Sequence, residues 1–245
     1  MGFHYFRQID STNSYARQLA ADGGLEGEIV IAEEQTSGRG RLGRNWFSPP
    51  FLNLYLSLIL RPRMPAAEAP QLTLMTAVAL TDAIRAFCSD AAVIKWPNDI
   101  LIGGRKIAGV LTESSCTGDS LEFVIIGVGI NVNCGRDLMP QTIRDRATSL
   151  LEINGGPVSR ENLLCGLIQA MDRCYGILEE RGFSAIAREW EARFGLRGRE
   201  VRVEAGDQTF IGRAAGIDRD GALLVESENG KVERVIAGDV IPVEG

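Results

Sequence analysis

Three arginines and three glycines fall within ten residues, Ser37-Gly38-Arg39-Gly40-Arg41-Leu42-Gly43-Arg44-Asn45-Trp46, of a chain that is otherwise acidic. Glycine lets backbone N–H groups approach a ligand, and guanidinium groups donate forked hydrogen bonds to carboxylates and phosphates. The stretch lies between two predicted strands, residues 28–32 and 53–60, so it forms a loop that can open and close. We predict that this loop binds a small anion, although a solvated surface loop has the same composition.

Helical and strand patterns alternate on both sides of this loop. Side-chain oxygens in Asp10-Ser11-Thr12-Asn13 suit the N-cap of a helix that ends at Asp22-Gly23-Gly24, or could also bind a polar ligand. Further strands are predicted over residues 93–95, 106–113 and 121–130, with turns at residues 97–99, 103–104 and 117–119. Helices are predicted over residues 65–89 and around two apolar stripes, Leu164, Leu167, Met171 and Leu178 in the first and Phe183, Ile186, Trp190 and Phe194 in the second.

The pattern changes after Gly195. Residues 196–245 have no helical period, only short β patterns separated by turn sequences at Ala205-Gly206-Asp207, Asp218-Arg219-Asp220-Gly221 and Asn229-Gly230. About fifty residues in about five strands is the size of an SH3-like barrel, which is too small to hold a large core alone. We predict two domains, residues 1–195 and residues 196–245, with the second docked on the first.

The composition is that of a soluble globular protein. The 245 residues are 45% hydrophobic, and no apolar run approaches the ~20 residues that a membrane span needs. The start of the chain has no export signal and the five cysteines include no CxxC pair, so we expect a cytoplasmic protein without structural zinc. A net charge of -6 opposes a general nucleic-acid coat, and a single histidine, His4, argues against a Ser-His-Asp triad and excludes a histidine-rich metal site.

Two further motifs place polar groups at a turn and along a strand. Lys95-Trp96-Pro97-Asn98-Asp99 holds a cation and a carboxylate four residues apart, and a second cation, Lys106, follows on a strand. Such a turn binds a nucleotide, a metal or both, or is a solvated surface turn. Gly127-Val128-Gly129-Ile130-Asn131-Val132-Asn133 is an apolar strand whose glycines mark either a bulge or the close approach of a flat ligand. The residues alone leave both alternatives open.

Taken in this order, the motifs resemble those of the biotin protein ligases. The resemblance rests on Asp10-Ser11-Thr12-Asn13, Gln35 with the loop up to Trp46, Lys95-Trp96-Pro97-Asn98-Asp99, Lys106-Ile107-Ala108-Gly109 and Gly127-Val128-Gly129-Ile130-Asn131. It extends to Gly238-Asp239-Val240, near the end of the chain. It implies an α+β fold, in which a class II synthetase-like mixed sheet with helices is followed by a small SH3-like β-barrel.

The resemblance also implies a reaction. The biotin carboxylate would attack the α-phosphate of Mg-ATP to form biotinyl-5′-AMP, and a lysine of a biotin carboxyl carrier protein would then attack the mixed anhydride. Lys106, Arg39 and Arg41 would offset the developing charge, and Asp99 would position or deprotonate the incoming lysine. Biotin, ATP and Mg²⁺ are the implied ligands. The implied binding residues are Ser11, Thr12, Asn13, Gln35, Gly38, Arg39, Gly40, Arg41, Arg44, Trp46, Lys95, Asn98, Lys106, Gly109, Gly127, Gly129 and Asn131.

The resemblance assigns most of these residues to parts of the ligand. The assignments are Ser11, Thr12, Gln35 and the Arg39 backbone to the ureido ring; Arg41 and Lys106 to the carboxylate; Gly109, Gly127 and Gly129 to a floor for the fused rings; Trp46 to a shield; and Asn131 and Arg44 to the nucleotide side.

Two departures from the family pattern change the expectation. Bifunctional relatives carry an N-terminal winged helix that binds DNA, whereas nine residues precede Asp10 here, so we expect a ligase that binds no specific DNA and no membrane. Some relatives have an arginine near the C-terminus, where this chain has Ile241-Pro242-Val243, so a nucleotide contact from the small domain would come from elsewhere or be absent. A homodimer is a further possibility, through an exposed sheet edge.

Two rival functions remain. A lipoate or octanoate ligase would share the architecture, but those families do not usually have the glycine–arginine loop. A biotin-sensing or anion-binding module without turnover would keep Ser11, Gln35 and the glycines, yet it would not need Lys95 or Lys106. The two lysines therefore favour an enzyme.

Overall fold

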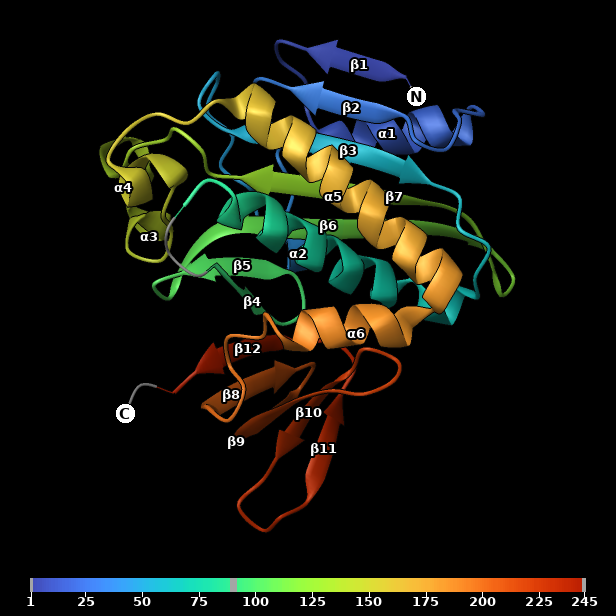
Figure 1. Ribbon diagram of the computed structural model, residues 1–245, viewed down its shortest axis with the longest axis vertical. Coiled ribbons are helices and arrows are strands. Elements are labelled where there is room, and N and C mark those ends of the chain that lie inside the picture. Colours follow the sequence, from blue (N-terminus) through green and yellow to red (C-terminus); the bar gives the residue numbers. More distant parts are fainter. Residues whose placement is uncertain (1, 89–91, 244–245) are drawn as a thin grey trace.

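The computed structural model describes residues 2–88 and 92–243. A large sheet with its helices forms the upper part of Figure 1, and a smaller all-β part lies below it. The large sheet has seven strands in the order β1-β2-β3-β7-β6-β5-β4, and β1 with β2 is its one parallel pair. Its strands are β1 (Phe3–Phe6), β2 (Ile29–Ala32), β3 (Leu54–Leu60), β4 (Val93–Lys95), β5 (Asp99–Ile102), β6 (Arg105–Thr117) and β7 (Ser120–Ile130).

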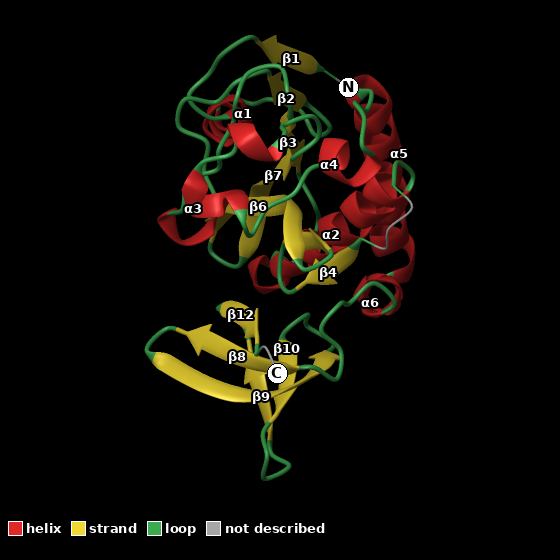
Figure 2. Cartoon of the chain, turned by 90° about the vertical axis from the view of Figure 1, so that its left-hand side faces the viewer, coloured by secondary structure: helices red, strands yellow, loops and turns green. Residues whose placement is uncertain are grey.

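Helices cover both faces of this sheet, as the side view in Figure 2 shows. Side chains alternate between the two faces along a strand. In β2, Ile29 therefore packs with the main core on one face and Val30 packs with a smaller cluster on the other. The main core includes α2 and α5, and the smaller cluster includes α1. The helices are α1 (Thr12–Ala21), α2 (Pro70–Arg85), α3 (Gln141–Arg144), α4 (Leu150–Asn154), α5 (Arg160–Arg181) and α6 (Phe183–Glu191).

The second sheet is antiparallel, with the strand order β11-β10-β9-β8-β12. All three predicted turn sequences join consecutive strands, so the small β module is confirmed. Among the described strands, β11 and β12 lie at the two edges, and the pairing does not close the sheet into the predicted barrel. The strands are β8 (Glu200–Ala205), β9 (Gln208–Ile217), β10 (Leu223–Glu226), β11 (Val232–Val235) and β12 (Asp239–Pro242).

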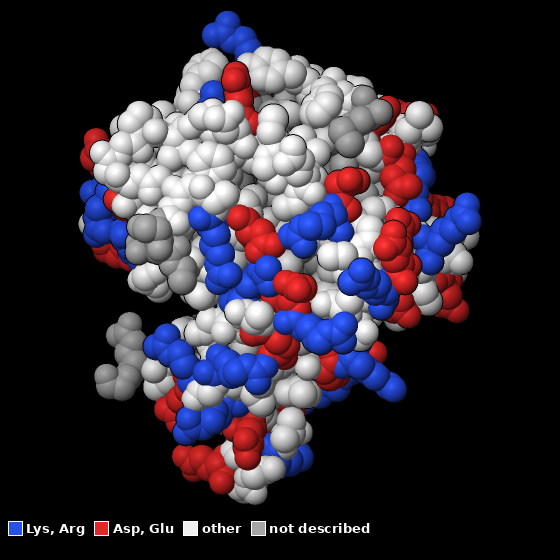
Figure 3. Space-filling model, viewed as in Figure 1, with Lys and Arg blue, Asp and Glu red and all other residues white. Residues whose placement is uncertain are grey.

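Trp96 connects the two sheets. Its indole is buried and its Nε1 donates a hydrogen bond to the carbonyl of Gly221, in the turn before β10, at 3.1 Å. On the strand next to it, the Ile94 N–H donates to the carbonyl of Arg193 at 2.8 Å. Charged side chains gather over the second sheet and its junction with the first on the face seen in Figure 3. The edge of the large sheet at β4 therefore lies against the small sheet.

Several predicted elements need correction. The predicted helix over residues 65–89 is a 3₁₀ turn, Ala66–Glu68, followed by α2, and its predicted end at Ser89 lies outside the described residues. Asp99 was predicted in a turn but begins β5, a strand too short to give a period of its own. The edge strand β1 and the short helices α3 and α4 were not predicted, for the same reason.

Candidate active site

A cavity of about 1050 Å³ opens where the carboxyl-terminal half of β7, the glycine–arginine loop and the second sheet meet. Every site residue predicted from the sequence lines it, so the structure brings together motifs that are up to about 120 residues apart. Their individual roles stay predictions. These lining residues are Ser11, Thr12, Asn13, Gln35, Gly38, Arg39, Gly40, Arg41, Arg44, Trp46, Lys95, Asn98, Asp99, Lys106, Gly109, Gly127, Gly129 and Asn131.

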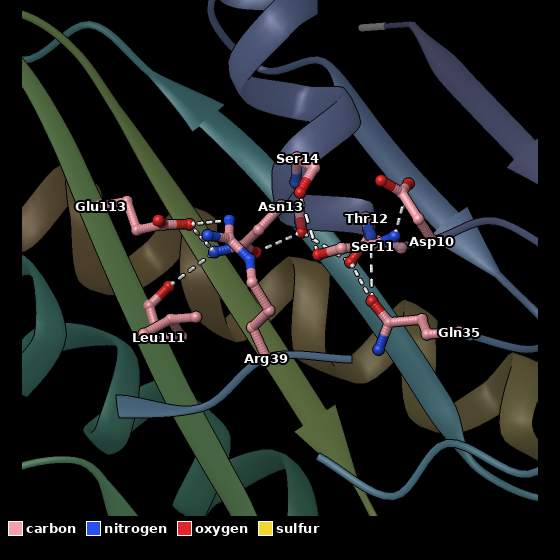
Figure 4. Close-up of polar contacts among 10 residues, drawn as sticks. Asp10, Ser11, Thr12, Asn13, Ser14, Gln35, Arg39, Leu111 and Glu113 are labelled. Carbon is pink, nitrogen blue, oxygen red and sulfur yellow. Dashed lines mark hydrogen bonds and ion pairs between the residues drawn. The ribbon is translucent and has the colours of Figure 1, made fainter. Parts of the chain in front are cut away.

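A polar cluster surrounds the start of α1 (Figure 4). Ser11 is the N-cap of this helix, and its side chain accepts a hydrogen bond from the Ser14 N–H. Gln35 Oε1 accepts hydrogen bonds from the Thr12 N–H at 2.9 Å and from Thr12 Oγ1 at 3.1 Å. Gln35 Nε2 donates to Ser48 Oγ at 3.0 Å. These groups form a preorganised set of donors and acceptors at one end of the cavity.

The glycines of β6 and β7 make room for side chains. A Cβ at Gly127 would lie 2.1 Å from Asn13 Oδ1, and one at Gly129 would lie 2.5 Å from the Trp46 indole. The residues left two explanations open for the glycines of β7, a bulge or the close approach of a flat ligand. In the structure the atoms nearest to Gly127 and Gly129 belong to protein side chains, so a ligand would lie against the indole or displace it.

The loop folds as a hairpin. The Trp46 N–H donates to the Gly38 carbonyl at 2.8 Å, and the Gly40 N–H donates to the Arg44 carbonyl at 2.7 Å. At the tip, Leu42 and Gly43 have positive φ angles, 56° and 71°. Backbone bonds of this kind hold the hairpin together internally.

Each arginine of the hairpin is anchored to a different element. Arg39 donates to Glu113 on β6 at 2.7 Å, and Arg41 donates to Asn98 before β5 at 3.1 Å. Arg44 pairs with Asp239 on β12 at 2.7 Å. Burial lowers the pKa of the Arg41 guanidinium, against the opposing attraction of the nearby carboxylates. Arg39 was predicted to act with Arg41 on developing charge, but its side chain is directed to Glu113.

Two lysines and two carboxylates form a linked group on the other wall. Lys106 pairs with Asp99 at 2.5 Å, and its ammonium lies 5.2 Å from the centre of the Trp46 ring. Lys95 lies 3.8 Å from Asp99 and 3.3 Å from Asp239. The group can hold an anion by exchanging a protein carboxylate for a carboxylate or phosphate of a ligand.

The remaining predicted residues shape the wall. The Asn98 side chain donates to the Val110 carbonyl at 2.7 Å, which holds it in place to accept from Arg41. Asn131 Nδ2 donates to the Thr148 carbonyl at 3.0 Å. Both side-chain amides are therefore held in fixed positions in the cavity wall by backbone carbonyls.

Sequence reasoning missed several residues of the site. Ser57 and Glu113 complete the polar cluster. Asp239 on β12 and Arg199, which directly precedes β8, also line the cavity. Asp239 had been noticed only as part of the motif Gly238-Asp239-Val240. Ser57 lies between Leu56 and Leu58 in the apolar strand β3, and a single hydroxyl within that apolar run was the signal available.

Replacing Asp239 with asparagine should reduce stability in a pH-dependent way. Burial raises the pKa of Asp239, but the attraction of Lys95 and the hydrogen bond from Arg44 outweigh it, so its pKa is lowered. A depressed pKa stabilises the fold above the unfolded pKa, about 4, and that contribution is lost as the pH falls through the folded pKa. We expect a deficit of about 1 kcal/mol at pH 7 that shrinks below about pH 4. Urea unfolding at a series of pH values measures it, and an equal deficit at pH 7 and pH 3 would contradict it.

The fold and the cavity define a class of protein: an α+β protein with a site that can bring small anions together. Comparison with known proteins narrows this class. The biotin/lipoate A/B protein ligase family matches residues 5–131, and the biotin protein ligase C-terminal domain matches residues 197–241. The chain belongs to this ligase family.

Sequence similarity to known ligases extends over nearly the whole chain. It is 39% identical to the bifunctional ligase/repressor BirA of Bacillus spizizenii, over 98% of this chain and 74% of the relative. It is 38% identical to the biotin acetyl-CoA-carboxylase ligase of Paracoccus denitrificans, over 91% of this chain and 94% of the relative. Among solved structures, the Aquifex aeolicus biotin protein ligase in complex with biotin and ATP has a TM-score of 0.84, at 29% identity, and the match covers 100% of this chain and 99% of that one.

Proposed function

We propose that this protein is an ATP-dependent biotin protein ligase, which activates biotin as biotinyl-5′-AMP and transfers it to a lysine of a biotin carboxyl carrier protein. The observation that carries the proposal is that the polar cluster, the glycine strands and the lysine–arginine walls line a single cavity. The names of the relatives and the Aquifex aeolicus complex with biotin and ATP support the same substrates.

In the first step, an oxygen of the biotin carboxylate attacks the α-phosphorus of ATP. A C–O–P anhydride bond forms while the bond to the pyrophosphate oxygen breaks, and pyrophosphate leaves. Two anions must approach each other for this to happen, so positive charge matters more than a protein nucleophile. Lys106 and Arg41 provide that charge in the cavity.

In the second step, the acceptor lysine attacks the acyl carbon. A C–N bond forms, AMP leaves as the phosphate end of the broken anhydride, and the amine loses a proton. Asp99 is the carboxylate nearest to Lys106, and it positions the incoming ammonium or takes its proton.

The ureido ring of biotin, with two N–H donors and one carbonyl, fits the polar cluster at the start of α1. Ser11, Thr12, Gln35 and the Arg39 backbone bond this ring. Among the described residues, the buried Trp46 Nε1 has no hydrogen-bond acceptor, and such a donor is costly unless a partner reaches it. A ligand oxygen beside the indole supplies that partner.

Mg²⁺ is proposed to enter with the phosphates of ATP. Within the described residues, no group of three or more His, Cys, Asp or Glu side chains could hold a metal ion, and Asp99 and Asp239 are each paired with cations. The metal neutralises phosphate charge when it is bound. The nucleotide side of the cavity is formed by Arg44 and Asn131, with Arg199, which directly precedes β8.

The wider setting is also a proposal. Residues 1–195 form the catalytic domain and residues 196–245 an SH3-like domain that closes one side of the cavity. In the described parts of the chain no helix has the length and apolar character needed to cross a membrane. We place the enzyme in the cytoplasm, expect no specific DNA binding from these 245 residues, and expect any homodimer to use the exposed edge strand β1, where Phe3 and Tyr5 are exposed.

Exchange of labelled pyrophosphate into ATP tests the proposal. With Mg-ATP, we expect exchange that depends on biotin, because formation of the adenylate is reversible. Lipoate and octanoate are run in parallel, since the family model includes lipoate ligases. Exchange that depends on lipoate or octanoate and not on biotin would show that biotin is not the substrate.

A further inference from the structure

We infer that Glu113 is a positioning residue of this site, because one of its carboxylate oxygens fixes a side chain of α1 and a side chain of the loop at once. The inference rests on the proposed function above. Oε2 of Glu113 accepts hydrogen bonds from Asn13 Nδ2 at 2.8 Å and from Arg39 Nη2 at 2.7 Å. In Figure 4 the carboxylate reaches both groups from β6.

The first consequence is the orientation of the Asn13 amide. An ionised carboxylate only accepts hydrogen bonds, so the NH₂ end of the amide must face Glu113. The second N–H of that group lies 3.3 Å from the Leu111 carbonyl. The carbonyl end then faces Ser57, whose Oγ donates to Asn13 Oδ1 at 2.6 Å. Asn13 and Ser57 are both buried, so water does not compete for these positions.

This orientation continues toward the ureido site. Ser57 has a single hydroxyl hydrogen, and Asn13 takes it. Thr12 Oγ1 lies 2.8 Å from Ser57 Oγ and 3.1 Å from Gln35 Oε1, so it must supply its own hydrogen to one of them. The lone pairs of the Thr12 hydroxyl are then left to accept from a ligand N–H. Glu113 thereby sets the direction of the hydrogen bonds that meet biotin, although it does not touch the ligand itself.

The second consequence concerns the loop. The hairpin bonds hold the loop together internally, and side-chain contacts tie its three arginines to other elements. Arg39–Glu113 is one of the three anchors described above, and the Arg39 side chain is 42% exposed. Because the Arg39 backbone is a proposed ureido contact, the anchor also holds that backbone against the polar cluster. Loss of this anchor should let the loop open more often over a bound adenylate.

Two single substitutions and their combination test the inference in the full chain. Glu113→Gln removes the charge and keeps the shape, and Arg39→Gln removes the loop anchor while leaving the contact between Glu113 and Asn13 in place. Glu122→Gln is the matched control, since Glu122 is a carboxylate on the same β6–β7 hairpin that bonds Ser115 and Thr117 away from the cavity. The measurements are the KM for biotin in pyrophosphate exchange and the release rate of preformed biotinyl-AMP.

We expect Glu113→Gln to raise both the KM for biotin and the release rate about tenfold, as expected for the loss of one charge-assisted hydrogen bond. Arg39→Gln should raise the release rate to a similar extent but raise the KM for biotin less than Glu113→Gln does, because Glu113 still holds the Asn13 amide. The double variant should release the adenylate no faster than either single variant, because both break the same anchor.

Several outcomes would overturn the inference. Glu113→Gln matching Glu122→Gln in both measurements would remove the positioning role, and additive release rates in the double variant would remove the shared anchor. If circular dichroism shows that Glu113→Gln does not fold, Arg39→Gln decides alone, and an unchanged release rate rejects the inference. The parent protein separates the two proposals: absence of biotin-dependent exchange in the parent overturns the proposed function itself, whereas normal exchange with unaffected variants overturns only the role of Glu113.

Discussion

Replacing Lys106 with methionine is expected to slow formation of the adenylate about a hundredfold, the effect of losing roughly 3 kcal/mol of transition-state charge stabilisation. Methionine keeps most of the length of the side chain and removes its charge. The ammonium opposes charge that builds up as carboxylate meets phosphate, so biotin binding should weaken far less than the rate. Single-turnover kinetics beside calorimetric titration with biotin measures both quantities.

Lys231 provides the matched control for this experiment. It directly precedes β11, and its side chain is 68% exposed and pairs with Glu233. Lys231→Met should leave adenylation and biotin binding near parental values. Equal losses of biotin affinity and adenylation rate in Lys106→Met would mean that Lys106 holds only the ground state.

A valine at Gly129 is the second substitution with a large expected effect. Its Cβ would lie 2.5 Å from the Trp46 indole, so the indole must move away from β7. The branched side chain then fills the space between the strand and the loop. We expect adenylation to fall by about a hundredfold or more, because a misplacement of about 1 Å in a positioned site has that effect. Stability should fall by about 1–3 kcal/mol from overpacking.

Gly176→Ala is the control, because a Cβ at this helical position meets no atom within 4 Å. Tryptophan fluorescence follows the displacement of the indole, and thermal unfolding confirms that the variant is folded. Full adenylation by a folded Gly129→Val protein would show that the surface of β7 lies outside the reacting site.

The residues alone predicted an anion-binding loop but left the turn at Lys95 and the glycines of β7 open. The resemblance to the biotin protein ligases supplied the full set of site residues, because it rests on short motifs that are local in the sequence. The long apolar strands and the stripe on α6 were equally accessible, since their periods extend over enough residues to be read. Short elements such as β1 and β5 gave no comparable pattern.

The contacts between the motifs could not be predicted in the same way. Glu113 is 100 residues from Asn13 and 74 from Arg39, so its role follows only from the fold. The same holds for Asp239, which pairs with Lys95 although the two are 144 residues apart in the sequence. The loop was predicted to open and close, and the structure has it as one anchored hairpin. Its opening remains a prediction.

The central claim is that this cavity joins biotin to AMP, and mass spectrometry of the reaction mixture tests it most directly. The purified protein is incubated with biotin, Mg-ATP and pyrophosphatase, then denatured to release what it holds. We predict biotinyl-5′-AMP in near one-to-one amount with the protein, and its disappearance when a carrier protein with an acceptor lysine is added, with biotin recovered on that lysine. Pyrophosphatase removes the reverse reaction, so finding only unreacted biotin and ATP in a folded, biotin-binding protein would contradict the claim.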